Sequence, residues 1–464
     1  MPSRQDQLHS YQYSLQRVVA ALVTHDPDPS RSPLRRAGTT ALISLLIASL
    51  AVGGAAVYGL LTGQSNVDPK DPNVVFQEKG SGARYVYLES DGKLHPVLNF
   101  ASGLLLAGAE APELKSISAD KLATLPLGAP LGIPDAPDSL PAKDDLLSTR
   151  WSVCTDNKGD EQTPRSTLLV GDRLTDGTIA ATAGEALLVR EPQGRTSLVY
   201  NNRRYPIPND DSVATLRALG WAGKEPWPVS AAWANAVPLA ANLVGPKIAD
   251  VGSDSTINGF KVGDLVTDSG KQFQVILADG AADISPVQAK LMQARPGVAE
   301  PRAIGNDFLQ LPQSKTRLNG DGDPNALPAS VPDLHDSTPA RVCMTLPVDA
   351  KTGDGVRIDP TVPEGVAVEP GNTGADVVLA DNVHIARGKG VLAVAAASPS
   401  APADSGTVSV VTDTGRSYPL ANRGLLTKLG YGGVKLNQIP SELISLLPRG
   451  PSLDPARARQ TDVQ

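Results

Sequence analysis

The stretch "LRRAGTTALISLLIASLAVGGAAVYGLLTGQ" (Leu34–Gln64) is far more apolar than the chain around it. It has no charged side chain from Ala37 to Leu61. A helix of this length, rising 1.5 Å per residue, crosses a hydrocarbon core of about 30 Å. A secretory signal peptide has an apolar stretch of only about 7–15 residues directly after a short basic head. We therefore interpret Ala37–Leu61 as the core of an uncleaved, single transmembrane helix.

The charges beside this helix predict its orientation. Arg31, Arg35 and Arg36 precede it, whereas Asp68, Lys70 and Asp71 on the far side show no positive excess. Lys and Arg accumulate on the cytoplasmic side of membrane helices. We expect a single-pass protein of the plasma (inner) membrane, with a cytoplasmic N-terminus and an extracytoplasmic bulk.

The segment before the membrane helix, residues 1–36, is predicted to be a cytoplasmic amphipathic helix followed by a linker. Its apolar residues recur at spacings of three and four, which is typical of one helix face. A single helix cannot bury such a stripe, so a neighbouring protein is favoured as its partner over the membrane surface. The stripe consists of Leu8, Tyr11, Leu15, Val18 and Leu22.

Composition limits the remaining possibilities. The chain has 464 residues, enough for two or three domains, and its 43 Gly and 40 Pro indicate many turns and short elements. The net charge of −7, without any basic stripe, argues against nucleic acid as a partner.

The sequence contains two cysteines, Cys154 and Cys343, both on the side predicted to be extracytoplasmic. Thiols in an oxidising compartment are expected to form a disulfide. If the membrane helix had the opposite orientation, the cysteines would lie in the cytoplasm, and two buried free thiols would be favoured. The bridge would close a loop of about 190 residues, which the chain-entropy model associates with about 4–5 kcal/mol of stabilisation.

Internal repetition is the main feature beyond the membrane helix. "YVYLESDGKLHPVLNFASGLLLAG" (from Tyr85) and "VSVVTDTGRSYPLANRGLLTKLG" (from Val408) both predict strand, turn, strand and short apolar helix. A shared L-P-x-G-x-x-L pattern follows at Leu125–Leu131 and Leu447–Leu453. Chance rarely matches turn, helix and tail together, so we interpret these segments as repeats.

Two further copies begin at Ser197 ("SLVYNNRRYPIPNDDSVATLRALGW") and at Asp264 ("DLVTDSGKQFQVILADGAADISPVQAKLM"). Gly and Asn tolerate the left-handed backbone that tight hairpin turns require. The predicted turn residues of the four hairpin-plus-helix repeats are Gly92, Asn202, Gly270 and Gly415.

The resulting fold class is α+β: one N-terminal transmembrane helix, then a β-rich extracytoplasmic central domain with four repeats. We expect the central domain to combine two distant pieces, which the disulfide joins, with repeats 2 and 3 inserted between them. The expected ranges are 1–36 (cytoplasmic helix and linker), 37–62 (transmembrane helix), 63–148 (repeat 1), 149–196 with 340–406 (central domain), 197–311 (repeats 2 and 3), 312–339 (Pro/Gly/Asp-rich linker) and 407–464 (repeat 4 and tail).

Candidate catalytic motifs have simpler explanations. Asp268-Ser269-Gly270 and Asp413-Thr414-Gly415 resemble the paired motif of aspartic proteases, but Lys271 and Arg416 follow them. Both triplets occupy predicted turns, where Asp and Gly are common for conformational reasons. We expect turns at these positions and no protease site.

Metal and nucleotide motifs are also incomplete. "NGDGDPN" (319–325) lacks the Gly and the closing Glu of a calcium loop, and the five histidines have no ligand spacing. No Gly-Lys pair belongs to a G-x-x-x-x-G-K-[ST] phosphate loop, and no G-x-S-x-G elbow occurs. We therefore expect no catalytic, cofactor or metal site.

A family resemblance now becomes specific. The basic head, the single membrane helix, Leu94–Ala101, Gly128–Pro134 and Trp151–Cys154 occur in the order that is typical of EccB. The chain resembles this single-pass core component of actinobacterial type VII (ESX) secretion systems over essentially its whole length. The resemblance implies a β-rich domain surrounded by repeats, and a disulfide that corresponds to Cys154–Cys343.

The resemblance also implies function and partners. EccB works with EccC, EccD and EccE in a membrane channel complex beside the mycosin protease, and its outer domain self-associates. Its N-terminal helix contacts the partner subunits. We expect a structural subunit that anchors and scaffolds the channel on the extracytoplasmic side. One alternative is an extracytoplasmic ATPase or hydrolase: family members carry the ATPase label, but this sequence has no phosphate loop. The other alternative is a peptidoglycan-binding anchor.

Overall fold

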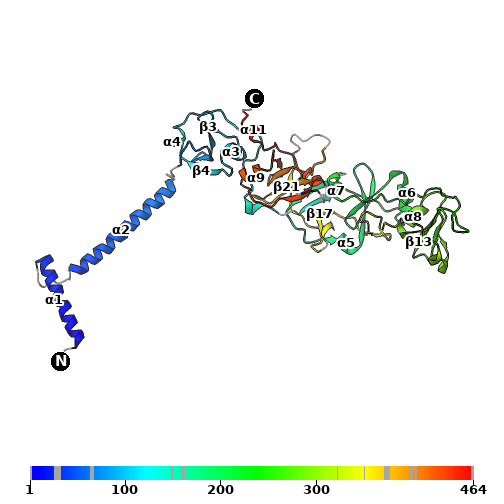
Figure 1. Cartoon of the computed structure of the whole chain (residues 1–464), viewed down its shortest axis with the longest axis horizontal. Coiled ribbons are helices and arrows are strands. Elements are labelled where there is room, and N and C mark those ends of the chain that lie inside the picture. Colours follow the sequence, from blue (N-terminus) through cyan, green and yellow to red (C-terminus); the bar gives the residue numbers. More distant parts are fainter. Residues whose placement is uncertain are drawn as a thin grey trace. The chain divides into compact units, whose positions relative to one another are not determined.

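The computed structural model describes residues 3–25, 33–62, 67–147, 150–157, 163–320, 322–349, 351–369, 377–397, 401–402 and 405–460. The chain divides into two compact units. Unit 1 comprises residues 1–95 and 113–128, and unit 2 comprises residues 96–112 and 129–464. Figure 1 shows the elements of both units, which are described separately.

The described part of unit 1 contains three helices and a small sheet (Figure 1). Helix α1 spans Arg4–Thr24, and α2 spans Pro33–Thr62 with Pro at its first position, where the missing N–H costs nothing. The sheet has the order β3-β2-β1-β4, and β4 runs parallel to β1. A core of Val74, Phe76, Leu94, Ile117 and Leu122 supports it. Its elements are β1 (Val74–Glu78), β2 (Arg84–Leu88), β3 (Lys93–Pro96), β4 (Glu113–Ile117) and α4 (Ala119–Leu122).

The largest sheet of unit 2, here called the central sheet, has seven strands in the order β19-β20-β6-β5-β17-β18-β7. Two distant chain segments form it, because β5 pairs antiparallel with β17 over Trp151–Asp156 and Arg341–Leu346. The strands are β5 (Trp151–Asp156), β6 (Arg165–Val170), β7 (Thr178–Ile179), β17 (Arg341–Asp349), β18 (Asp354–Ile358), β19 (Val366–Ala367) and β20 (Asn382–His384).

Three smaller sheets in unit 2 share the strand order of the unit 1 sheet. In each, three consecutive strands lie side by side and a fourth pairs parallel with the first. We call the four sheets modules 1 to 4 in chain order. Module 2 has β8 (Glu185–Arg190), β9 (Thr196–Tyr200), β10 (Arg203–Ile207) and β11 (Trp227–Pro228), and β16 (Asp333–Leu334) also pairs with β8; module 3 has β12 (Leu265–Thr267), β13 (Phe273–Leu277), β14 (Gly280–Ile284) and β15 (Arg302–Ala303); module 4 has β21 (Gly390–Ala396), β22 (Val408–Thr412), β23 (Ser417–Pro419) and β24 (Asn437–Pro440).

Short helices connect the strands, and most of them follow the third or fourth strand of a module. They are α3 (Phe100–Leu106), α5 (Ala180–Ala183), α6 (Ser212–Ala218), α7 (Ala231–Ala236), α8 (Pro286–Gln293), α9 (Leu425–Lys428), α10 (Ser441–Ile444) and α11 (Pro455–Ala458), with 3₁₀ turns η1 (Lys143–Asp145), η2 (Asn209–Asp211) and η3 (Gly305–Gln310). Ser230 caps α7, and a Ser285–Gln288 capping box begins α8.

Each module ends in a tail that pairs parallel with its third strand. The four bridges are Leu94–Leu127, Arg204–Leu239, Ala281–Gln313 and Ser417–Arg449. In every tail the bridged residue follows a Pro and precedes a small residue, whose N–H bonds back to the third strand. The four tails are Leu125–Gly128, Val237–Ala240, Leu311–Ser314 and Leu447–Gly450. The L-P-x-G pattern expected in two copies is thus one instance of a shared backbone pairing.

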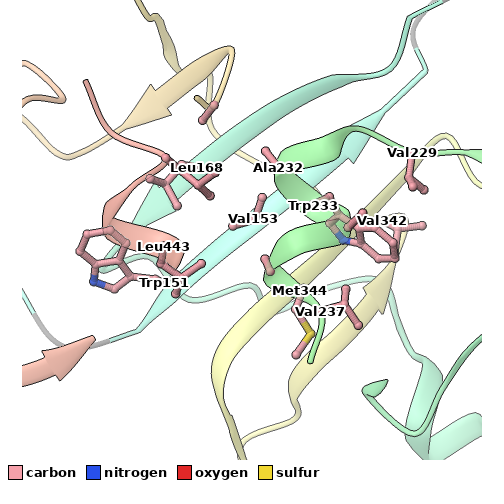
Figure 2. Close-up of a cluster of buried hydrophobic side chains, with 14 of the residues drawn as sticks. Trp151, Val153, Leu168, Val229, Ala232, Trp233, Val237, Val342, Met344 and Leu443 are labelled. Carbon is pink, nitrogen blue, oxygen red and sulfur yellow. The ribbon is translucent and has the colours of Figure 1, made fainter. Parts of the chain in front are cut away.

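The main core of unit 2 lies on one face of the central sheet. Figure 2 shows Trp233 of α7 and Leu443 of α10 over the strands that carry Val153 and Val342. The side chain of Trp233 is fully buried. Because α7 belongs to module 2 and α10 to module 4, these two modules share the core of the central sheet.

The predicted α+β class, with one N-terminal apolar helix ahead of a body of several sheets, is confirmed. Two expected boundaries differ from the structure. The sequence pattern places residues up to 196 and up to 406 in the central domain, but β8 and β21 form the first strands of modules 2 and 4. Both are buried apolar strands, and a local pattern does not reveal which sheet such a strand joins.

Candidate functional site

The membrane helix is the most prominent candidate. The segment Gly38–Gly59 of α2 is long and apolar enough to cross a membrane, and none of it is buried within the chain. Leu42, Ile47 and Leu50 expose 68%, 61% and 66% of their surface. So much exposed apolar surface on one helix requires a lipid or protein environment.

The predicted ends of the membrane segment, Ala37 and Leu61, both lie inside α2. Arg35 and Arg36 lie in the first turn of this helix, whereas Arg31 lies outside the described residues. The predicted orientation in the membrane stays a prediction.

The N-terminal stripe is a second candidate. A capping box begins α1, in which the Ser3 hydroxyl accepts from Asp6 N at 3.3 Å and the Asp6 carboxylate accepts from Ser3 N at 3.0 Å. Leu8, Tyr11, Leu15, Val18 and Leu22 are each at least half exposed, from 53% to 75%. A stripe of this kind is a surface that another protein can cover.

Cys154 and Cys343 form a disulfide. They lie directly opposite each other on β5 and β17, with Cα atoms 3.9 Å apart, and both are fully buried. Leu169, Leu174 and Val362 cover them. The bridge therefore joins the two halves of the central sheet on either side of the segment that contains modules 2 and 3.

Two of the four predicted turn residues contact the central sheet. Asn201 and Asn202 have φ of 48° and 60°, and Asn202 Oδ1 accepts from Val356 N at 2.7 Å. Gly415 has a φ of 75°, and a Cβ there would lie 3.2 Å from Val383 Cβ on β20. These turns therefore hold modules 2 and 4 against the central sheet. The sequence pattern identified the turns but not the strands that they contact, β18 and β20.

The other two turn residues have local roles. Gly92, with a φ of 67°, lies between the second and third strands of module 1, as Asn202 and Gly415 do in theirs. Gly270, with a φ of 90°, lies instead between the first and second strands of module 3. The equivalent turn there is Asp279–Gly280, so the assumed equivalence of Gly270 with the others is corrected. Both turns of module 3 contain an Asp and a Gly, which made them indistinguishable by pattern.

Asp268, from the protease-like triplet, has a structural role. Its Oδ1 accepts from Gln272 N at 2.9 Å and from Lys271 N at 3.0 Å. Backbone hydrogen bonds, the largest from Gln272 and the next from Ser269, lower the pKa of Asp268 to about 2. The carboxylate therefore holds the turn in place.

A buried ion cluster lies within module 2. The Glu191 carboxylate accepts from Arg204 Nη1 at 2.6 Å, from Ser197 Oγ at 2.7 Å and from Arg195 Nε at 3.0 Å. Burial raises the pKa of Glu191, but the bonds from Arg195 and Ser197 and the charge of Arg204 outweigh it, so the pKa lies below its usual value. Because these partners occupy the acceptor sites of Glu191, its carboxylate stabilises module 2 and is not available to bind a ligand.

The remaining chemistry is sparse. Among the residues the structure describes, no three His, Cys, Asp or Glu side chains come together as a metal site requires. His95 is buried and its Nε2 lies 3.0 Å from Asp91 Oδ2. Its ring packs on Gly128 of the module 1 tail, where a Cβ would overlap it. His95 therefore has a packing role between the third strand and the tail of module 1.

Comparison with known proteins gives this geometry a context. The family model described as "Type VII secretion system ESX-1, transport TM domain B" matches residues 1–463. The ESX-3 secretion system ATPase EccB3 of Mycobacterium tuberculosis is 28% identical over 492 residues, which cover 97% of this chain and 88% of that protein. The ESX-5 secretion system ATPase EccB5 of Mycobacterium marinum is 26% identical over 485 residues, which cover 98% and 93%.

Two solved structures share the fold. One is a chain of an intact ESX-5 inner membrane complex, with a TM-score of 0.66, 22% identity, and coverage of 99% of this chain and 95% of that one. The other is the EccB3 dimer from the ESX-3 core complex, with a TM-score of 0.63, 24% identity, and coverage of 84% and 100%. With a family match over nearly the full length, the chain belongs to the EccB family of type VII secretion system transmembrane components.

Proposed function

We propose that this secretion-system subunit anchors and scaffolds a type VII channel complex in the plasma membrane. In this proposal α2 crosses the membrane once, α1 engages neighbouring subunits in the cytoplasm, and the sheets lie outside. The observation that supports this proposal is that α1 and α2 each expose an apolar surface. The β-rich body that follows them has a core of buried apolar side chains.

The relatives support assembly. One structure with this fold is a chain of an ESX-5 inner membrane complex, and another is a dimer of EccB3. We infer that this chain also joins a membrane complex and pairs with a second copy. EccC-, EccD- and EccE-type subunits, with a mycosin protease nearby, are the proposed neighbours.

The proposed orientation has two supports. Arg35 and Arg36 precede the apolar segment, as is typical of a cytoplasmic flank. The disulfide lies after α2, and disulfides persist in oxidising compartments outside the cytoplasm. Protease added to spheroplasts should degrade the part of the chain after α2 while α1 survives. Protection of that part, with reduced thiols, would contradict the orientation.

The stripe on α1 gives a direct test of the scaffold role. The double variant Leu15→Asp/Leu22→Asp places charges on the stripe, and Gln16→Asp adds a charge outside it as the matched control. After extraction in mild detergent, the parent and the control should elute in a large complex, and the stripe variant should elute alone. Elution of the stripe variant with the complex would show that α1 is not the contact.

ATP hydrolysis is the second candidate, because both named relatives are called ATPases. The chain has no Walker A phosphate loop in its sequence. Purified protein that releases phosphate from ATP, with one substitution abolishing release, would establish this activity. Retention on isolated peptidoglycan would instead support the third proposal, a cell-wall anchor.

A further inference from the structure

A cavity of about 390 Å³ lies where module 2 meets the central sheet. Its wall includes Asn201 and Arg203 from the β9–β10 turn, Val348 and Asp354 from the β17–β18 hairpin, and Pro238 from the module 2 tail. Small-ligand sites are typically about 300–1,000 Å³, with mostly apolar walls and a few convergent polar groups. The volume of the cavity lies in this range, and the cavity borders the Asn202 turn described above.

Asp354 presents a hydrogen-bond acceptor in this wall. Its side chain is 7% exposed. Oδ2 accepts from Arg150 Nε and Nη2 at 3.0 and 2.9 Å and from Thr352 Oγ1 at 2.5 Å. Within the described chain Oδ1 accepts no hydrogen bond. The Arg150 cation already balances the charge of this carboxylate, so a neutral N–H or O–H donor from a ligand suits Oδ1.

Arg203 presents the complementary group. Its Nη1 donates to Asn325 Oδ1 at 2.7 Å, and it makes no ion pair with the described residues. Its Nε and Nη2 donors remain, and they form the fork that binds a carboxylate through two parallel hydrogen bonds. Because Arg150 and Asp354 neutralise each other, Arg203 leaves the cavity with a net positive charge.

The apolar part of the wall indicates which non-polar group the ligand carries. Ile179, Pro238, Pro324 and Val348 line the cavity, and Val348 is 42% exposed. Aliphatic side chains and proline rings of this size contact a small aliphatic group well. A ligand that satisfies all three features has a carboxylate, a nearby N–H donor and an aliphatic side chain.

We propose that this cavity binds the carboxyl-terminal end of a peptide whose last side chain is small and aliphatic. The terminal carboxylate pairs with Arg203, a backbone N–H donates to Asp354 Oδ1, and the side chain packs against Val348 and Pro238. Among the described residues, Arg203 Nε and Nη2 and Asp354 Oδ1 make no hydrogen bond, so the two polar groups of the peptide end can pair with them.

The test uses the full-length protein in detergent and the fluorescein-labelled peptide Gly-Ala-Ala-Val, with either a free carboxylate or a terminal amide. Fluorescence polarisation should show that the acid binds about tenfold more tightly than the amide, the value of one charge-assisted hydrogen-bond contact. Arg203→Gln should lower the affinity for the acid to that for the amide. Asn422→Gly, an exposed Asn in module 4 outside the cavity, should leave both affinities unchanged.

A second variant keeps the result interpretable if Arg203→Gln fails to fold. Val348→Asp places a carboxylate in an exposed part of the apolar wall, where it repels the peptide carboxylate and removes the apolar contact. This variant should abolish binding of both peptides while melting like the parent. Equal affinity for acid and amide, or no binding of either at millimolar concentration, overturns the proposal. Binding of an N-acetylglucosamine trimer that displaces the acid peptide also overturns it, because a neutral saccharide does not need the carboxylate fork.

Discussion

Asn202 and Val356 join two parts of the chain that are far apart in sequence: the carboxamide of Asn202 accepts the Val356 N–H at 2.7 Å. Asn202 lies in a left-handed turn of module 2, and Val356 lies on β18 of the central sheet. The turn thus satisfies a backbone donor of another sheet, as buried backbone groups require.

Gly355→Ala should weaken this joint. Gly355 has a φ of 142°, and a Cβ there would overlap the Asn202 carboxamide. We expect a loss of about 1–3 kcal/mol in unfolding free energy, measured by denaturant titration. Gly194→Ala is the control, because Gly194 has a φ of 78° but no atom within 4 Å of its Cβ position. Equal losses in both variants would show that backbone strain alone, and not the Asn202 contact, sets the cost.

Trp233→Ala should destabilise the core shared by modules 2 and 4. The indole is fully buried over the central sheet, and removing such a ring costs about 3–5 kcal/mol through lost burial and the cavity left behind. Thermal unfolding followed by tryptophan fluorescence and circular dichroism measures the loss. Trp233→Phe keeps most of the volume and should lose less. If the two variants melt together, the indole is not a packing residue.

Removing the disulfide with Cys154→Ser/Cys343→Ser should lower the unfolding free energy by about 4–5 kcal/mol. The bond spans 189 residues, so its loss greatly increases the entropy of the unfolded chain. Chemical denaturation of the parent in reducing buffer should show a matching loss. Unchanged stability in both experiments would mean that the pairing of β5 with β17 suffices alone.

Acid should loosen the Asp268 turn. The pKa of Asp268 is lowered from 3.8 to about 2, so its stabilisation is fully present above 3.8 and is lost as the pH falls through 2. Asp268→Asn keeps a carbonyl acceptor but cannot titrate, so its stability should depend less on pH between 4 and 2. Unfolding curves at several pH values measure this difference. Parallel pH profiles for variant and parent would contradict the role of the carboxylate.

Ile47→Arg should impair membrane insertion. Ile47 is exposed near the middle of Gly38–Gly59, and an arginine at the centre of a membrane helix costs about 2.5–3.5 kcal/mol. Alkaline carbonate should release more of this variant from membranes than of the parent. Ile47→Ala is the control and should stay in the pellet. Equal release of the two variants would count against α2 as the membrane-spanning element.

The sequence predicted those features that depend on neighbouring residues. The apolar run of α2, the stripe on α1 and the turns at Gly92, Asn202 and Gly415 all have local causes in composition and backbone preference. The pairing of Cys154 with Cys343 followed from there being two cysteines and from the family resemblance.

Features that depend on distant pairing could not be predicted. The parallel fourth strand of each module is short, and only its pairing with the first strand identifies it, as with Trp227–Pro228 on β8. The joint at Val356 and the cavity lined by Asp354 need the central sheet in place, because residues more than 150 positions apart meet there. A local hydrophobic pattern predicts the type of an element but not which distant strand or turn it will contact.

The bond between Cys154 and Cys343 turns the intervening polypeptide into a covalent ring. A pulling force applied between α2 and the C-terminal module passes through two sulfur atoms and bypasses modules 2 and 3. Those modules can therefore bend, open or even be nicked by a protease without interrupting mechanical continuity along the chain. In a subunit fixed in a membrane at one end, the central sheet and its disulfide would bear a pulling force. Modules 2 and 3 could change conformation without bearing that force.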